Sequence, residues 1–224
     1  MGRAPRNSQG GYVYHAIGRG LKPKPMFRSE EDYQDFEAVL CEMVERFEPR
    51  ILSYCVLPKH WHLILVPRKD GDLSKLMAWL TITHSARWHA KPRRSGTGGL
   101  YERRFKAFPV QDDLSLLELI RFVESHPKRT GSIDSVVETW RWSSGFMRGN
   151  GSGQSKVPIS SSPIALPTDW LAQINQAQPE EILLRIENAI ARSCPYGDPL
   201  WVAKTAKRLG LESTVRPRGR PKKA

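Results

Sequence analysis

Residues Ser53-Tyr-Cys-Val-Leu-Pro-Lys-His-Trp-His-Leu-Ile-Leu-Val66 decide the fold of this 224-residue chain. Two apolar runs flank a tight Pro58-Lys59 turn, which predicts a β-hairpin with strands at Arg50 to Leu57 and His60 to Pro67. A hairpin joins antiparallel strands. Successive side chains of a strand point to opposite faces, so we expect His60 and His62 on one face and Trp61 on the other.

The two histidines are candidate ligands of one metal ion. Neutral imidazoles bind divalent cations well, and a pair on a rigid strand leaves coordination positions for a phosphate oxygen and for water. The plainer interpretation is that His60 and His62 face solvent and bind nothing. The spacing alone does not decide between the two.

The other periodic segments predict an α+β fold, in which helices flank an antiparallel sheet. Apolar residues recur at strand or helix spacing in five further segments. We expect strands at Gly11 to Arg19 and Arg104 to Val110, and helices from Ser29 to Phe47, from Asp72 to about Lys91, and from Asp112 or Asp113 to Pro127.

Composition favours a polyanionic partner. Lys and Arg number 35 against 23 Asp and Glu, which gives a formal net charge of +12. Such a charge suits binding to nucleic acid, although a basic protein without that function would have the same composition.

No stretch approaches the ~20 apolar residues of a membrane span and no signal peptide is recognisable, so we expect a cytoplasmic protein with no membrane partner. The three cysteines are widely spaced, which favours reduced thiols.

Basic residues cluster between the second helix and the following strand, interleaved with Trp88, Tyr101 and Phe105. Such a band around a Gly-rich loop predicts a groove for a DNA backbone. A solvated helix face would explain only Arg87 and Lys91. Farther along, Trp140 and Trp142 either stack on unpaired bases or close the core as a lid. The basic band consists of Arg87, Lys91, Arg93, Arg94, Arg103, Arg104 and Lys106.

The chain divides by composition into four parts. We expect a domain at 1–148, a Gly- and Ser-rich flexible linker at 149–165, a small helical unit at 166–213 and a basic tail at 214–224. The tail carries Arg216, Arg218 and Arg220 in an Arg-Gly-Arg context typical of an AT-hook, which lies in the minor groove of A·T-rich duplex DNA. A polybasic tail without sequence preference is the alternative.

Several motifs together resemble the REP-associated tyrosine transposases, which are Y1-type HUH enzymes of the IS200-like transposase superfamily. The resemblance covers nearly the whole chain. Its motifs are Tyr14-His-Ala-Ile-Gly-Arg-Gly20, Leu57-Pro-Lys-His-Trp-His62, Gly71-Asp-Leu-Ser74, Thr83-His84, Leu100 to Val110, Arg121-Phe-Val-Glu-Ser-His-Pro127 and Trp140 to Ser144.

The resemblance implies the HUH, ferredoxin-like fold and a chemistry. In this family the two strand histidines bind Mg²⁺ or Mn²⁺, which polarises a phosphate of single-stranded, hairpin-forming (REP-like) DNA. A helix tyrosine then attacks that phosphate and becomes linked to the 5′ end. Family members are commonly dimers, so the resemblance also allows a homodimer.

This chain departs from the family at the nucleophile. The family motif on the third helix is Arg-Tyr-Val-Glu-x-Asn-Pro, and Phe122 occupies the tyrosine position. His126 replaces the asparagine and, four residues from Phe122 on the same helix face, could be a third metal ligand. Phe122 marks either a lineage that lost cleavage and kept binding or a deliberate substitution made to trap substrate. Tyr101 and Tyr54 are the nearest substitute nucleophiles in the sequence.

Three functional hypotheses follow. The first is a transposase that cuts and transfers single-stranded hairpin DNA. The second is a non-catalytic protein of the same fold that binds hairpins without cutting them. The third, a metal hydrolase that uses water, needs a general base that the sequence does not identify.

Overall fold

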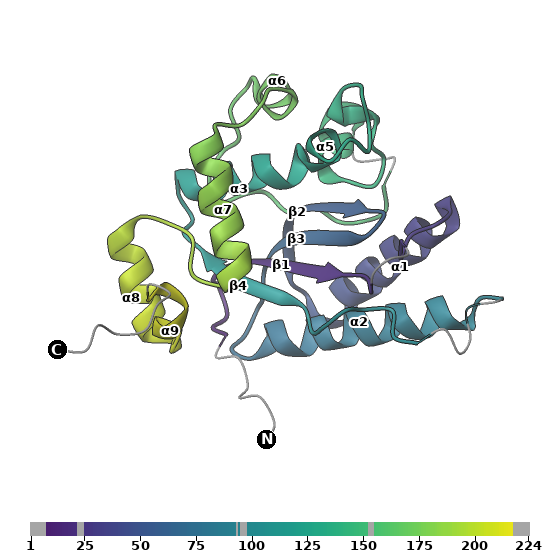
Figure 1. The fold of residues 1–224 in the computed structure, drawn as a ribbon, viewed down its shortest axis with the longest axis horizontal. Coiled ribbons are helices and arrows are strands. Elements are labelled where there is room, and N and C mark those ends of the chain that lie inside the picture. Colours follow the sequence, from purple (N-terminus) through teal and green to yellow (C-terminus); the bar gives the residue numbers. More distant parts are fainter. Residues whose placement is uncertain (1–7, 22–24, 93, 95–97, 152–154, 217–224) are drawn as a thin grey trace, which may run out of the picture.

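The computed structural model describes residues 8–21, 25–92, 94, 98–151 and 155–216. Arg93, Arg218 and Arg220 therefore lie outside the described residues. The described part contains a four-stranded antiparallel sheet with the order β2-β3-β1-β4, flanked by helices (Figure 1). The strands are β1 (Val13–Arg19), β2 (Arg50–Leu57), β3 (His60–Val66) and β4 (Lys106–Val110).

The helices form two layers and a C-terminal group. Two long helices, α1 and α2, lie on one face of the sheet, and α3 and α7 lie on the other (Figure 1). The bounds are α1 (Glu30–Phe47), α2 (Asp72–Ala90), α3 (Leu114–Glu124), α4 (His126–Arg129), η1 (Val137–Thr139), α5 (Ser144–Asn150), α6 (Trp170–Asn175), α7 (Glu180–Arg192), α8 (Pro199–Leu209) and α9 (Glu212–Val215).

The β2–β3 hairpin confirms the expected antiparallel α+β fold. Its ends pair Leu57 with His60 across the Pro58-Lys59 turn. Odd-numbered residues of β3 such as Trp61 pack toward α1 and α2, and even-numbered residues such as Ile64 pack toward α3. His60 and His62 thus share the α3 face, as strand alternation predicts.

The second helix is more deeply covered than its sequence indicates. This helix carries His84 and Trp88, and the sequence interleaves Trp88 with the basic band. In the structure both side chains are buried, because α2 packs against α1 as well as beneath the sheet. Trp88 Nε1 donates to the carbonyl of Met26, and the His84 ring stacks on Phe27. Trp88 is therefore not part of an exposed basic band.

The C-terminal helices share the core of the sheet. Ile186, Ala189 and Ile190 of α7 are buried in one cluster with Ile17, Phe108 and residues of α3, among others. Val157, inside the segment predicted to be a linker, is buried against the opposite cluster. In the described residues, the predicted helical unit therefore packs on the domain that it follows.

Candidate metal site and nucleic-acid interface

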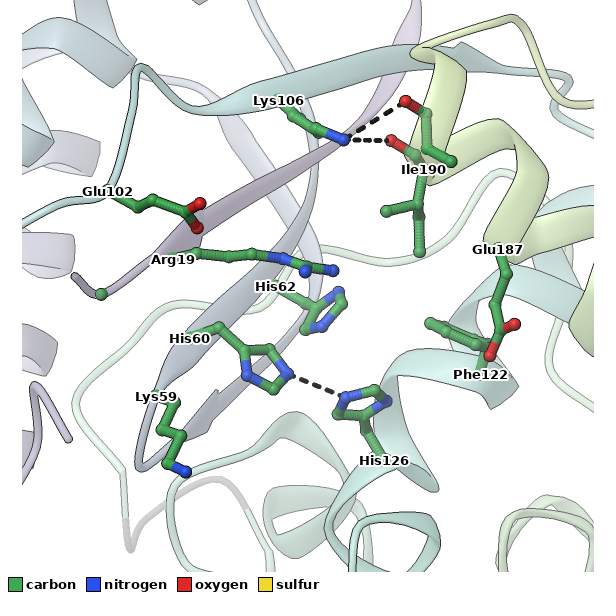
Figure 2. Close-up of a pocket in the computed structure, with 12 residues that line it drawn as sticks. Arg19, Lys59, His60, His62, Glu102, Lys106, Phe122, His126, Glu187 and Ile190 are labelled. Atoms are coloured by element: carbon green, nitrogen blue, oxygen red, sulfur yellow. Dashed lines mark hydrogen bonds between the residues drawn. The ribbon is translucent and has the colours of Figure 1, made fainter. Parts of the chain in front are cut away.

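A pocket of about 460 Å³ opens where β3, α3 and α7 approach one another. Figure 2 shows His60, His62 and His126 grouped on one side of it, with Phe122 beside them. Arg19 of β1 and Lys59 of the hairpin turn supply positive charge to its lining. Glu102, Lys106, Glu187, Ile190 and Ala191 complete most of the wall.

Three histidines converge although they come from two distant segments. His60 Nε2 lies 2.9 Å from His126 Nε2, and one ligand atom from each of His60, His62 and His126 lies within 4.8 Å of the others. Metal–imidazole bonds are about 2.1 Å, so two nitrogens on one ion are at most about 4.2 Å apart. Small side-chain movements would bring all three onto one ion.

An unpartnered buried nitrogen indicates that the site fits a metal ion. His62 is 2% exposed, and its Nε2 atom has no hydrogen-bond partner among the described residues. A buried polar atom without a partner is costly unless something binds it. A divalent cation at His62 Nε2 would satisfy this atom.

Burial keeps the three imidazoles neutral, which is the form that binds metal. Burial, together with the smaller effect of the charges of Arg19 and Arg129, lowers the pKa of His60 to about 4. The pKa values of His62 and His126 also lie well below the ordinary value, first because of burial and then because of neighbouring cationic or imidazole groups. Proton competition for these ligands therefore begins at lower pH than at an exposed histidine.

Arg129 was not predicted by the sequence and lies directly behind His126. Its guanidinium contacts His126 Nδ1, donates to the Phe122 carbonyl and covers the Phe122 ring at 3.9 Å from the ring centroid. Arginine can only donate, so the contact makes Nδ1 an acceptor and leaves the proton of His126 on Nε2. His126 becomes a metal ligand through Nε2 only when this contact opens.

Phe122 occupies the nucleophile position without a nucleophile. It is 2% exposed. The centroid of its ring lies 6.1 Å from that of the His62 ring and 5.4 Å from that of the His126 ring.

The two candidate substitute tyrosines have hydroxyl groups that bond to other residues. Tyr54 donates to Glu37 at 2.7 Å, and the Tyr101 hydroxyl accepts from Trp61 Nε1 at 3.1 Å. None of the described residues that line the pocket is a tyrosine.

The structure separates the predicted basic band into two groups. Arg87 pairs with Glu42 at 2.7 Å, and Arg94 pairs with the buried Asp32 at 2.7 Å. Lys106 lines the pocket but donates to the carbonyls of Ile190 and Ala191 at 3.2 and 3.3 Å. These three cations are engaged within the protein.

Lys91 is also engaged, because its Nζ atom lies 2.9 Å from a carboxylate oxygen of Asp32 and 2.6 Å from one of Asp35. The remaining described members of the band, and Arg216 of the tail, face outward. Arg103 and Arg104 are exposed between the Gly-rich loop and β4, and Arg216 is exposed at the last described position. Trp88 and Phe105, predicted to interleave with the band, are each 5% exposed and cannot offer stacking faces. Their large rings contribute to the apolar core instead.

The tryptophan pair closes the core. Trp142 is 8% exposed and its ring stacks on Tyr33 with centroids 4.9 Å apart. Trp140 Nε1 donates to the carbonyl of Val56 at 2.9 Å. The lid interpretation of Trp140 and Trp142 therefore describes the structure, and stacking on bases does not.

Sequence reasoning missed several residues that line the pocket or lie behind it, for identifiable reasons. Arg19 pairs in register with His60 across β1 and β3, a relation that requires the strand order. His15 shares the β1 face of Ile17, and strand alternation could have placed it beside the histidine pair. Glu187 carries no local signal, because α7 reaches the pocket only through tertiary packing.

Fold and site together define an α+β protein with a three-histidine pocket on one sheet face, and a solved structure shares this fold. The chain is similar to the structure titled REP-associated tyrosine transposase bound to a REP hairpin, with a TM-score of 0.55 and 16% identity over 75% of this chain and 100% of that one. At this identity, the likeness shows the fold.

The family follows from sequence comparison. The model described as Transposase IS200 like matches residues 8–126. A Haemophilus influenzae protein whose name describes a REP-associated tyrosine transposase is 25% identical over 122 residues, covering 50% of this chain and 69% of that protein. The chain belongs to the IS200-like transposase family, and the resemblance inferred from its motifs is confirmed. In the described residues, no helix is long and apolar enough to cross a membrane.

Proposed function

We propose that this protein binds single-stranded, hairpin-forming (REP-like) DNA and holds one phosphate at a divalent metal ion without forming a covalent link to it. The observation that carries the proposal is the convergence of three neutral imidazoles in a pocket that also contains Arg19 and Lys59. The relative whose title names a REP hairpin supports the substrate class.

His60 and His62 would hold Mg²⁺ or Mn²⁺, and His126 would join them when its contact with Arg129 opens. A bound ion would polarise a phosphate oxygen.

Arg19 and Lys59 line the pocket as cations, so they would attract the phosphate and orient it. Arg103 and Arg104, exposed on the sequence that leads into β4, would contact the DNA backbone with Arg93.

The side chain at position 122 determines whether DNA can be cleaved through a covalent link or only bound. A phenyl ring retains the packing of a tyrosine and lacks its hydroxyl, which is the atom that would attack phosphorus. Tyr54 and Tyr101 cannot replace it, because their hydroxyls are bonded away from the pocket. Cleavage through a tyrosine is the second candidate function, and the same experiment tests it.

The test compares the protein with Phe122→Tyr on hairpin-bearing single-stranded DNA in the presence of Mn²⁺. We expect both proteins to shift the hairpin in a native gel. Only the tyrosine variant should give a covalent adduct in a denaturing gel, because the ring is already placed beside the histidines. The matched control, Phe122→Tyr combined with His62→Ala, should give none.

Two results would contradict the proposal. An adduct formed by the unaltered chain would make it a cleaving transposase, and failure to bind hairpins would remove the substrate class. An inert Phe122→Tyr protein that still binds would mean that the chain differs from cleaving relatives at more positions than Phe122.

We also propose that the tail adds a duplex contact. Arg216 is its only candidate within the described residues, and Arg218 and Arg220 lie beyond them. Deletion of residues 216–224 should weaken binding to A·T-rich duplex more than to G·C duplex, because the guanine amino group obstructs the minor-groove floor. Equal losses on both duplexes would reduce the segment to a polybasic arm.

A further inference from the structure

A fourth histidine lies behind the candidate metal site. His15, on β1, is fully buried, and its Nε2 atom lies 2.9 Å from Nδ1 of His62. The two rings stack at 13° with centroids 5.1 Å apart, and the edge of Phe108 closes against His15. His15 does not line the pocket, so it can act on a bound ion only through His62.

The contact constrains which nitrogen of His62 faces the pocket. A neutral imidazole has one N–H and one lone pair. If His62 Nε2 binds a metal, Nδ1 must carry the proton, and the acceptor within reach of that proton is His15 Nε2. Metal-binding histidines commonly donate their second ring nitrogen in this way, which fixes both tautomer and ring orientation.

We propose that His15 is the positioning residue of the metal site, accepting a hydrogen bond from His62 Nδ1 so that the Nε2 lone pair of His62 points into the pocket. This inference rests on the proposed metal site and extends it to a residue outside the pocket. His15 contacts neither the metal nor the DNA.

The cost of this arrangement for the metal-free fold supports a functional role. His15 Nδ1 and His62 Nε2 are both buried without a hydrogen-bond partner among the described residues. At position 15, a side chain of similar size without polar atoms would pack against Phe108 and avoid burying the unpaired Nδ1 atom of His15. A metal at His62 Nε2 removes one of the two unpaired atoms and orders the hydrogen bond behind it.

Two substitutions separate positioning from packing. His15→Leu fills the space without an acceptor, and His15→Gln can place an amide oxygen near the position of His15 Nε2. The matched control is His84→Leu, because His84 is 2% exposed, also lies in an aromatic cluster, and is on the opposite face of the sheet. Circular dichroism and melting curves establish that each variant is folded.

The measurement is Mn²⁺ affinity, from the electron paramagnetic resonance signal of free Mn²⁺, in the full-length protein without DNA. We expect His15→Leu to weaken binding ten- to a hundredfold, as loss of outer hydrogen-bond partners typically does. His15→Gln should recover most of the affinity, and His84→Leu should leave it unchanged. With Mg²⁺, two-bond ¹H–¹⁵N couplings should show the Nδ1–H form of His62 in the unaltered protein.

The outcomes distinguish this inference from the metal site itself. Loss of Mn²⁺ binding in His60→Ala/His62→Ala, together with unchanged binding in folded His15→Leu, would overturn the role of His15 alone. Unchanged binding in the double variant would overturn the metal site and the inference with it. An equal loss in His15→Gln and His15→Leu would assign His15 to packing.

Discussion

At the scale of single residues, Arg129 hinders metal binding by His126. His126 is placed to contribute a third imidazole, but the Arg129 guanidinium contacts its Nδ1 atom. Burial lowers the pKa of Arg129 to about 10, so the side chain remains charged at neutral pH. A fixed cation beside a divalent ion opposes its binding, and its contact with Nδ1 leaves a proton on the nitrogen that would bind the metal.

We therefore expect Arg129→Met to raise Mn²⁺ affinity, by on the order of tenfold, because methionine keeps an apolar chain over Phe122 and removes the charge. Titration of the protein with Mn²⁺ measures this directly. The control is Arg121→Met, because Arg121 contacts the carbonyl of Ala177 and does not line the pocket. Weaker binding in Arg129→Met would show that Arg129 supports the site.

At the scale of elements, the pairing of β1 with β3 sets the positions of the histidines. Gly18 pairs with Trp61, the residue between the two candidate ligands. A Cβ atom at Gly18 would lie 2.3 Å from the Trp61 ring, so only glycine lets the indole pack flat against β1. Trp61 is fully buried, and the backbone on either side of it carries His60 and His62.

Gly18→Ala should therefore disturb both stability and the metal site. Overpacking a close contact typically costs about 1–3 kcal/mol, which urea unfolding would measure, and we expect Mn²⁺ affinity to fall with it. Gly99→Ala is the matched control, because a Cβ there meets its nearest atom at an ordinary 3.7 Å. Equal stability of the two variants would mean that Trp61 can shift without cost.

At the scale of the whole molecule, the three-layer arrangement buries histidines on both faces of the sheet. Burial lowers the pKa of His15, on the α3 face, and of His84, on the α1–α2 face, to about 3. In the unfolded chain, a histidine titrates near 6.5. The unfolded state therefore binds more protons than the folded state between pH 6.5 and about 3, and the stability from these histidines is lost as pH falls through that window.

For the metal-free protein, we expect the free energy of unfolding to decrease from pH 7 to pH 5 by about 2 kcal/mol for each such histidine. Urea unfolding at several pH values measures the slope. His84→Gln removes one titrating group, so its unfolding free energy should fall less over the same range. A slope identical to that of the unaltered chain would place the His84 pKa near its ordinary value.

The sequence by itself determined the local geometry of this protein. The hairpin, the shared face of His60 and His62, and the helix that carries Phe122 all follow from periods of two or about 3.6 residues, which depend on neighbours along the chain. The expected continuation of that helix to Pro127 was wrong, because α3 ends at Glu124 and His126 begins α4. Segment boundaries agree with the structure to within about two residues for the strands. The motifs also identified the family, because their combination is specific even where each motif is not.

Only the tertiary structure decided which of these groups meet. His60 and His126 are 66 residues apart, and His15 and His62 are 47 apart, so their contacts depend on strand order and on the docking of α3. Tertiary packing also brings α7 beside the pocket and, on the opposite face of the sheet, turns Trp88 and Arg94 toward internal partners. Side-chain burial and pairing are consequences of long-range packing, whereas alternation along a strand is a property of the chain itself.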